Sequence, residues 1–402
     1  MKILQICKKS LYPAKDGEAI AIRTITKGLY EAGHEVTVLT IATYKHPFDK
    51  EKLPNSLQQI AHFDSTFVNT NISSIAAFVN LFSSKSYSIQ RFYNTDFEAQ
   101  IIDYLQQTDF DVVHLEGVYL ATYIPAIRQN CKAPIVMRAH NLEFEIWERL
   151  AAEQTNPLKW WYMTLLAKRM KKFELDSLQL YDGLVPISVV DERQWKDFGF
   201  SKPCWTMAGS IDLKDYPLAE KTIVDVPSVF FIGSLDWMPN IEGLQWFFGE
   251  VWSQVIEVFP DLQCFIAGRN APDWFLKQQI PNVVFVGEVP NAVEFMQSKG
   301  AMICPLFSGS GMRIKIIEAM ALAKPIVATS IAAEGINCSS GENILMADLP
   351  KAFAGALLKC VESEIFAGKI GENAREFVVR EHDTRELIEG LVGFYEGVIG
   401  GK

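Results

Sequence analysis

Short runs of apolar residues alternate along the chain with longer segments in which apolar residues recur at helical spacing. Residues 2–7 form an apolar run. Residues 18–32 then carry apolar positions at 20, 22, 25 and 29 before Gly33, and residues 35–41 form a second run. A glycine directly after a helical pattern is typical of a helix end. The order strand, helix, strand predicts a βαβ unit with parallel strands.

This alternation continues over the first half of the chain. Further strands are predicted at residues 64–69, 111–115, 134–139, 183–187 and 204–207. Long helices are predicted at residues 89–107, 119–129 and 157–180. Because the strands are almost continuously apolar, we expect one sheet that helices cover on both faces.

A second series of the same kind begins near residue 228. Its predicted strands are residues 228–232, 264–267, 283–286, 301–305, 326–329 and 344–346. Its predicted helices are residues 240–256, 273–279, 291–298, 312–323, 349–363 and 366–380. The two series predict an α/β protein with two Rossmann-like, doubly wound parallel-sheet domains.

Residues 208–226 separate the two series, since they show no periodicity and contain breakers. We therefore place an N-terminal domain at residues 1–212 and a C-terminal domain at residues 213–382. A last apolar helix, 384–398, lies beyond the second series. We expect residues 383–402 to pack back on one of the domains, with the N-terminal domain as the candidate. Ligands bind beyond the carboxyl ends of the strands in such sheets, so the two domains are expected to face a central cleft.

Composition and charge narrow the function classes. Apolar residues make up 49% of the 402 residues and charged residues 21%, which is too apolar for a disordered chain. The formal net charge of −10 argues against nucleic acid as a partner. No apolar run reaches the roughly 18 residues of a membrane-spanning helix, and the first run is too short for a signal peptide. Seven cysteines without close spacing predict a reducing, cytoplasmic location rather than a disulfide scaffold or a zinc site.

The segment PLFSGSGMRIKIIEAM, residues 305–320, is the most informative for chemistry. An apolar strand runs into a Gly/Ser loop that opens a helix. Gly309 and Gly311 permit close backbone approach, and the helix N-terminus offers free N–H groups to a phosphate. Arg313 and Lys315 add two positive charges at the same place.

Glu318 lies three residues after Lys315 and shares its helix face. A carboxylate there can accept hydrogen bonds from both hydroxyls of a ribose. We expect Ile314, Ile317 and Ala321 to face the sheet. The alternative interpretation is a capped helix in which Lys315 and Glu318 form an ordinary surface pair. The segment is not a P-loop, because the Gly-Lys-Ser/Thr ending is absent.

The chain resembles the family 4 glycosyltransferases of the GT-B fold over nearly its whole length. The most specific match is GSGMRIKIIEAMALAKPIVATSIAAEGI, residues 309–336. The supporting matches are residues 16–40, 138–150, 231–248, 265–269 and 283–291. The resemblance implies a retaining, hexosyltransferase-type enzyme that moves a sugar from a nucleoside diphosphate sugar to a hydroxyl acceptor in cell-surface polysaccharide or glycolipid assembly. It implies no metal and no cofactor. It places the donor on the C-terminal domain and a saccharide or lipid-linked acceptor on the N-terminal domain.

The resemblance also implies roles for single residues. Glu318 matches the carboxylate that holds the donor ribose, and Gly17 matches a glycine in the first N-domain loop, where backbone approaches the diphosphate. His140 follows an N-domain strand, where such enzymes often touch the transferred sugar. The expected donor-binding residues are Gly17, Gly233, Ser234, Gly309, Ser310, Gly311, Arg313, Lys315 and Glu318.

Three places depart from the family pattern. Ser310 stands where the family often has the first Glu of a Glu-x7-Glu pair, and Asp16 stands where a second glycine is common beside Gly17. The loop at residues 233–240 lacks the usual Arg and Lys. We hypothesise that Arg313 and Lys315 supply that missing positive charge to the leaving diphosphate.

The expected mechanism is front-face substitution, in which a donor phosphate oxygen takes the proton of the attacking hydroxyl. No protein nucleophile is evident, so His140 is expected to orient the sugar; the alternative is a structural loop histidine. The predicted catalytic residues are His140, Arg313 and Lys315. Two other functions stay open, a GT-B nucleotide-sugar epimerase and a non-catalytic binding or partner subunit, and Ser310 with Asp16 favours the second.

One predicted helix mixes aromatic and basic residues, at Lys159–Tyr162 and Lys168–Lys172. One interpretation is a patch that rests on the inner face of the membrane, where a lipid-linked acceptor is anchored. The other is a scaffold helix with core aromatics and a solvated basic end. The run Asp109-Phe110-Asp111 has the Asp-x-Asp spacing of metal-dependent sugar transferases. It precedes a strand, however, and so lies at the amino edge of the sheet, which is the wrong edge for a metal site.

Overall fold

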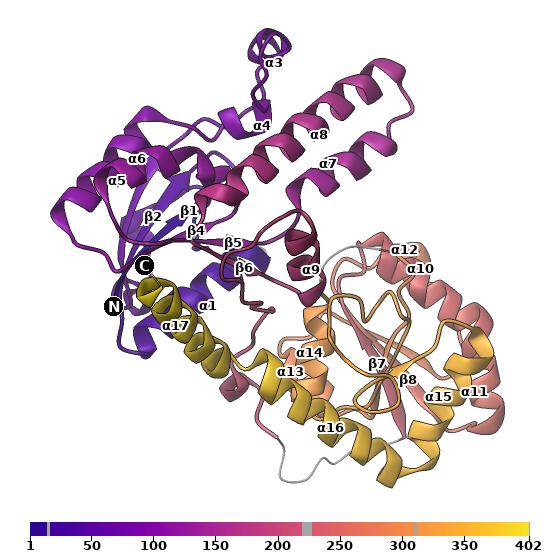
Figure 1. Cartoon of the computed structure of the whole chain (residues 1–402). Helices are drawn as coiled ribbons and strands as arrows, with labels where there is room; N and C mark the ends of the chain where they lie inside the picture. The colour runs from indigo at the N-terminus through magenta and orange to yellow at the C-terminus, as the bar shows by residue number, and fades with distance from the viewer. Residues whose placement is uncertain (14–16, 219–226, 309–311, 402) are drawn as a thin grey trace. The chain divides into compact units, whose positions relative to one another are not determined.

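The computed structural model of the chain describes residues 1–13, 17–218, 227–308 and 312–401 (Figure 1). These residues form two compact units. Unit 1 comprises Met1–Ala208 together with Leu387–Lys402, and unit 2 comprises Gly209–Glu386. Four positions named above, Asp16, Gly309, Ser310 and Gly311, lie outside the described residues.

Unit 1 is built around a parallel sheet with the strand order β3-β2-β1-β4-β5-β6. The strands are β1 Lys2–Cys7, β2 Glu35–Ala42, β3 His62–Phe67, β4 Val112–Glu116, β5 Ile135–Ala139 and β6 Gly183–Pro186. Alternate side chains enter two different cores, since Leu4 and Ile6 belong to one apolar cluster whereas Ile3 and Cys7 belong to another. Both faces of the sheet are therefore covered, as the continuous apolar runs predict.

The helices of unit 1 connect these strands and extend beyond them. They are α1 Gly17–Glu31, α2 Asn55–Gln58, α3 Ser74–Asn80, α4 Tyr87–Gln90, α5 Thr95–Gln107, α6 Ile124–Asn130, α7 Glu143–Ala152, α8 Pro157–Ser177 and α9 Val189–Asp197. A 3₁₀ helix at Val118–Tyr123 leads into α6. Helices α7 and α8 pack against each other as a hairpin (Figure 1).

Two sequence predictions for this unit are wrong. The helix expected at residues 89–107 is two helices, because the side chain of Asn94 accepts hydrogen bonds from the backbone N–H groups of Asp96 and Phe97, each at 2.9 Å, and starts α5 anew. The strand expected at residues 204–207 is reduced to one isolated bridge between Leu184 and Cys204.

Unit 2 repeats the same topology with different residues. Its parallel sheet has the order β12-β11-β10-β7-β8-β9, and β7 takes the central place that β1 has in unit 1. The strands are β7 Ser228–Ile232, β8 Gln263–Ala267, β9 Val283–Gly287, β10 Ala301–Cys304, β11 Ile326–Ala328 and β12 Leu345–Met346. The prediction of two doubly wound parallel sheets is thus confirmed.

The helices of unit 2 are α10 Met238–Trp246, α11 Trp252–Val258, α12 Asp273–Leu276, α13 Ala292–Gln297, α14 Ile314–Ala321, α15 Pro350–Glu362 and α16 Glu364–His382. The helix expected at residues 240–256 is interrupted by a π-helical turn at Phe247–Val251. On α14, Ile317 and Ala321 are fully buried, but Ile314, the first residue of the helix, is 40% exposed. The prediction that Ile314 faces the sheet is therefore wrong.

The last helix, α17 Thr384–Gly400, packs on unit 1. Leu391 and Tyr395 are fully buried in the same apolar cluster as the α1 residues Ile22 and Ile25. The contact is close, since a Cβ built on Gly28 of α1 would lie 2.4 Å from Ile388. Helix α17 therefore completes one face of the unit 1 core.

We expect Leu391→Ala to lower the free energy of unfolding of unit 1 by about 2–5 kcal/mol, because it leaves a cavity beneath α17. Hydrogen exchange of the β1 and β4 backbone amides measures unit 1 by itself. The control is Glu396→Ala, on the exposed face of the same helix. Equal protection in the two variants would show that α17 does not support the core.

Candidate functional site

In unit 2 the predicted donor residues gather where the strand order reverses. The sheet runs outward from β7 in one direction and from β10 in the other. Gly233 and Ser234 directly follow β7, and Arg313 is the N-cap residue of α14, which follows β10. Loops at such a reversal diverge from one another, and ligands of doubly wound sheets bind there.

Lys315 reaches from α14 to the loop after β7. Its Nζ donates a hydrogen bond to Oδ1 of Asn240 at 3.0 Å and lies 4.1 Å from the ring centre of Phe231. Asn240 in turn donates to the backbone oxygen of Ser234 at 2.7 Å. A Cβ built on Gly233 would lie 3.2 Å from the Lys315 Nζ, so glycine gives the amino group room. Lys315 therefore places a positive charge beside the loop at residues 233–240, which contains no Lys or Arg.

The positive charge of Lys315 faces a neutral amide and an aromatic ring. Arg313 is 6% exposed, and its guanidinium lies 5.6 Å from the ring centre of Trp237. Burial lowers the pKa of both Arg313 and Lys315 from their ordinary values. Two cations that are partly removed from water at a helix N-terminus form a place suited to an anion.

Glu318 does not form the surface pair with Lys315 that the alternative interpretation proposes. Its Oε1 instead accepts a hydrogen bond at 2.7 Å from the hydroxyl of Tyr216, a residue 102 positions earlier. Burial raises the pKa of Tyr216, and the nearby Glu318 carboxylate raises it further. The Tyr216 hydroxyl therefore fixes the orientation of this carboxylate.

In unit 1, Gly17 and His140 lie at the carboxyl edge of the sheet. Gly17 is exposed and opens α1, and a Cβ built on it would meet no protein atom within 4 Å. His140 follows β5 and is 9% exposed. Gly117 follows β4 with a φ of +100°, a backbone conformation that favours glycine, and it lies between Lys8 and His140.

His140 belongs to a buried polar network centred on Glu116, the last residue of β4. Glu116 is fully buried, and its Oε1 accepts from Gln5 Nε2 at 2.8 Å and from His114 Nε2 at 3.1 Å. Its Oε2 accepts from Arg138 Nη1 at 3.4 Å and lies 2.9 Å from His140 Nε2. Strands β1, β4 and β5 thus all contribute to holding one carboxylate against His140.

The network extends to the C-terminal helix. The hydroxyl of Tyr395 on α17 lies 2.5 Å from Nδ1 of His114. The two ring nitrogens of His114 thus contact different partners, Nε2 the carboxylate of Glu116 and Nδ1 the hydroxyl of Tyr395. A continuous line of contacts therefore runs from Tyr395 through His114 and Glu116 to His140.

The charge states in this network follow from burial and neighbours. Burial opposes ionisation of Glu116, but His114 and Arg138 outweigh it and hold the pKa of Glu116 well below its ordinary value. Burial lowers the pKa of His140 from its ordinary value, and the bond to Glu116 opposes this only in part. Glu116 is therefore a carboxylate and His140 a neutral imidazole at neutral pH.

Beside this network lies a hollow of about 880 Å³, at the carboxyl ends of β1, β2 and β3. Its basic lining includes Lys8, Lys9, Lys45 and Arg91. Glu18 lies among them, with its carboxylate oxygens 2.9 Å from Lys9 Nζ and 3.5 Å from Lys8 Nζ. This edge of unit 1 can therefore accept a polar, hydroxyl-rich ligand.

Several of these residues were not found from the sequence. The predicted strand 111–115 stops one residue short of Glu116, and nothing in the local sequence marks Glu116 as the centre of a network. Asn240 and Tyr216 act across 75 and 102 positions, so only the fold brings them to Lys315 and Glu318. Among the described residues, no cluster of three or more His, Cys, Asp or Glu could hold a metal. In the same residues, no helix is long and apolar enough to span a membrane.

Comparison with known proteins gives consistent matches. Residues 16–214 match the family model for Glycosyltransferase Family 4, and residues 226–363 match that for Glycosyl transferases group 1. The chain is 24% identical over 404 residues to an uncharacterized 44.6 kDa protein in the cps region of Klebsiella pneumoniae, covering 97% of this chain and 98% of the relative. It is 26% identical over 205 residues to the phosphatidyl-myo-inositol mannosyltransferase of Mycobacterium leprae, covering 48% of this chain and 51% of that protein.

The fold is also similar to that of solved structures. The Anabaena protein HepE in complex with UDP has a TM-score of 0.64 and 14% identity, over 99% of this chain and all of that one. Together, the two family models cover residues of both units. The two doubly wound parallel sheets are consistent with both models. The chain belongs to the family 4 glycosyltransferases and has the GT-B fold.

Proposed function

We propose that unit 2 binds a nucleoside diphosphate sugar, and that a hexose passes from it, with retention and without a metal ion, to a hydroxyl of an acceptor on unit 1. As a family member, the chain is a glycosyltransferase of polysaccharide or glycolipid synthesis. The relative from Mycobacterium leprae is named for a lipid-linked acceptor, and HepE was solved with UDP. We propose the same classes here, a lipid-linked saccharide as acceptor and a nucleoside diphosphate sugar as donor.

The single observation that carries the proposal is the position of Lys315. A half-buried ammonium group at a helix N-terminus, held by a neutral amide against the loop after β7, needs an anion to complete its surroundings. A diphosphate develops negative charge as it leaves, and a fixed cation stabilises that charge more than it stabilises the bound substrate. Arg313 and Lys315 are proposed to perform this role.

Glu318 supports the same assignment. One of its oxygens is held by Tyr216. A carboxylate has further acceptor positions on both oxygens, and paired ribose hydroxyls are donors that match them. The base and ribose would thus be held at α14, with the diphosphate at the N-terminus of the same helix.

The state of His140 supports a role in orientation. A neutral imidazole fixed by Glu116 can hydrogen-bond a sugar hydroxyl. It carries no positive charge that would repel the developing oxocarbenium character of the sugar. In the proposed front-face reaction, the bond from the anomeric carbon to the diphosphate oxygen breaks as the bond to the acceptor oxygen forms. The acceptor proton passes to a phosphate oxygen of the leaving group.

We expect Lys315→Met to weaken binding of UDP or GDP and to lower turnover by about 10²–10³-fold, the loss typical of one electrostatic group at a transition state. The matched control is Lys299→Met. Lys299 lies 4.4 Å from the ring centre of Phe265, a similar cation–π contact, but it precedes β10 at the amino edge of the sheet. Calorimetry and nucleoside diphosphate release measure the two effects. Unchanged affinity and turnover in Lys315→Met would remove the basis of the proposal.

The proposed contact between Glu318 and the ribose is tested by removing a ribose hydroxyl. We expect the native chain to prefer UDP, or whichever diphosphate binds, over its 2′-deoxy form by about 10–100-fold, because a hydrogen bond to a charged group is lost. Glu318→Gln should bind the ribose form less tightly and reduce this preference. Tyr216→Phe should have a smaller effect of the same kind. Calorimetric titration of both nucleotides into each variant gives the comparison, and an undiminished preference in Glu318→Gln contradicts the assignment.

Glu116 is expected to act through His140. We expect Glu116→Gln and His140→Ala each to lower turnover by about 10–100-fold through loss of sugar orientation, with nucleotide affinity retained. The double variant should lose little beyond either single one, because the two residues form one unit. Additive losses in the double variant would mean that Glu116 serves the fold alone.

A panel of nucleotide sugars, screened by thermal shift, identifies the donor for these assays.

A further inference from the structure

Residues 72–82, here called the α3 segment, expose an unusual amount of apolar surface. The exposed side chains are Ile72 (74%), Ile75 (78%), Phe78 (63%), Val79 (62%) and Phe82 (84%). Single exposed apolar residues are normal on protein surfaces, but five large ones within eleven positions form a patch. Figure 1 shows α3 standing out from the rest of unit 1.

The opposite side of this segment is firmly held. Arg169 of α8 donates hydrogen bonds to the backbone oxygen and Oδ1 of Asn80, both at 2.8 Å, and to the backbone oxygen of Leu81 at 3.0 Å. The backbone N–H of Ser73 donates to the hydroxyl of Tyr87 at 3.0 Å. The polar contacts thus fix both ends of α3, and the apolar side chains are left facing outward.

Helix α8, whose Arg169 holds the end of the α3 segment, also exposes large apolar and aromatic residues. At its start, Leu158 is 79% exposed, Trp160 is 50% exposed and Trp161 is 54% exposed. The aromatic stretch noted in the sequence is therefore on the surface rather than in the core. Tryptophan is the residue that most favours the boundary between water and lipid, since it joins a large apolar ring to one polar N–H.

The charge of these segments is opposite to that of the whole chain. Residues 65–95 and 154–173 contain no Asp or Glu, although the chain has 48 acidic residues and a net charge of −10. The same two stretches contain Lys85, Arg91, Lys159, Lys168, Arg169, Lys171 and Lys172. Lys171 and Lys172 pair with Glu148 and Asp176, so the positive charge that these stretches offer to a partner comes from the exposed Lys85, Lys159 and Lys168.

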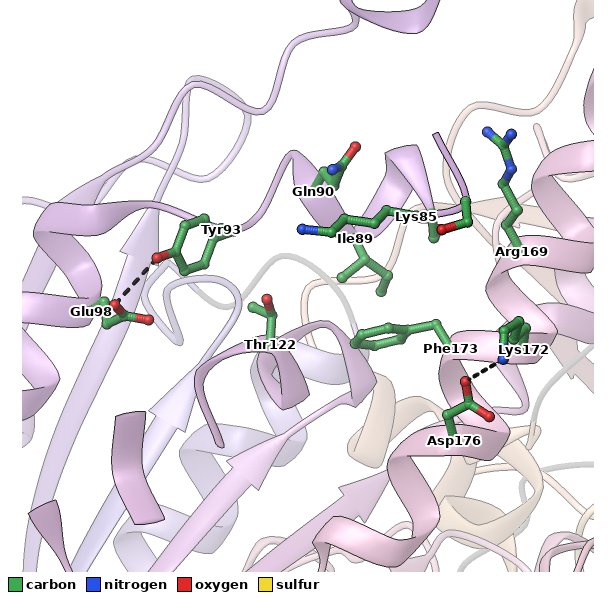
Figure 2. A pocket seen from close by; sticks show the side chains of 12 residues that line it. Lys85, Ile89, Gln90, Tyr93, Glu98, Thr122, Arg169, Lys172, Phe173 and Asp176 are labelled. Atoms are coloured by element: carbon green, nitrogen blue, oxygen red, sulfur yellow. Dashed lines mark hydrogen bonds and ion pairs between the residues drawn. The ribbon is translucent and has the colours of Figure 1, made fainter. Parts of the chain in front are cut away.

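A hollow of about 670 Å³ opens at the base of the α3 segment, between α4, α5 and α8 (Figure 2). Figure 2 shows Ile89 and Lys85 on its α4 side, and Phe173 with the paired Lys172 and Asp176 on its α8 side. Ile89 and Phe173 give the hollow an apolar wall, and most of the remaining lining is polar, with Lys85, Arg169 and the acidic Glu98 among it.

We propose that the α3 segment and the first turns of α8 form one docking surface for a bilayer with anionic lipids. The apolar side chains enter the lipid boundary, and Lys85, Lys159 and Lys168, all exposed, face lipid phosphates. A symmetric contact between two copies would place this positive surface against itself, which like-charge repulsion disfavours. The benefit to catalysis, access to a lipid-linked acceptor, rests on the proposed function, but vesicle binding does not require sugar transfer.

Co-sedimentation of the full chain with vesicles tests the proposal. We expect binding to phosphatidylcholine vesicles that contain phosphatidylglycerol, weaker binding to phosphatidylcholine alone, and loss of binding at high salt. Phe78→Ser with Phe82→Ser should lower the affinity about tenfold or more, because two inserted rings are removed. The matched control is Leu349→Ser with Ile365→Ser, at two positions of unit 2 that are 70% and 88% exposed.

Charge is tested separately. The triple variant Lys85→Glu, Lys159→Glu, Lys168→Glu should abolish binding to the anionic vesicles. The triple variant Lys277→Glu, Lys351→Glu, Lys359→Glu makes the same change in net charge at exposed sites of unit 2 and should bind as the native chain does. Retained UDP or GDP affinity in every variant shows that unit 2 is intact. A failure of vesicle binding is therefore distinguishable from a failure of the donor site.

Three results would overturn the proposal. The native chain could fail to sediment with anionic vesicles. The control variants could lose binding as much as the surface variants do. In sedimentation velocity without lipid, Phe78→Ser with Phe82→Ser could convert a dimer to a monomer while vesicle binding stays unchanged, which would make the α3 segment an interface between copies of this chain.

Discussion

The reversal of strand order within each sheet is the constraint on which the candidate site of each unit depends. A parallel sheet releases every strand at the same edge, and the loops after β1 and β4, or after β7 and β10, leave in opposite directions. Backbone groups and side chains can then surround a ligand without an intervening strand. Lys8 and Gly117 occupy this position in unit 1, as Gly233 and Lys315 do in unit 2. Two dissimilar sequences therefore place their candidate binding residues at the same point of the same topology.

The two units handle buried charge in opposite ways, and this difference indicates what each is for. Glu116 is a buried carboxylate with donors from Gln5, His114 and Arg138, so its charge is satisfied within the protein. Its effect is internal, since it holds the neutral His140 in place. Lys315 has an amide and a ring as its neighbours. Removing a charge from water is costly unless a partner replaces the water, which is the physical basis of the proposed anionic ligand in unit 2. The first arrangement suits the orientation of a side chain, and the second suits the binding of an anion.

How far the sequence could predict this structure depended on the range of the interaction involved. The strands were predictable because a strand covered on both faces is continuously apolar, as in residues 2–7 and 228–232. The helix at 89–107 was predicted wrongly because Asn94 suits a helix poorly but caps one well, and the apolar period continues across it. The helix N-terminus with Arg313, Lys315 and Glu318 was a local pattern. Its partners Asn240 and Tyr216 are set by tertiary structure, and so is the exposure of Phe78 and Phe82, which an apolar sequence alone would assign to a core.

The core of unit 1 includes residues from the end of the chain, because α17 packs on it. Helix α16 closes unit 2, where His382 Nδ1 lies 2.7 Å from the backbone oxygen of Gly209, and α17 then returns to unit 1. Without α17, the apolar faces of Ile22 and Ile25 lack their cover, and Nδ1 of His114 lacks the Tyr395 hydroxyl. Both losses act on the network that holds His140, one through packing and one through hydrogen bonding. Residues 1–208 therefore contain every strand of unit 1 but not all of its core. The core of unit 1 is therefore complete only when the segment that follows unit 2 in the sequence has packed on it.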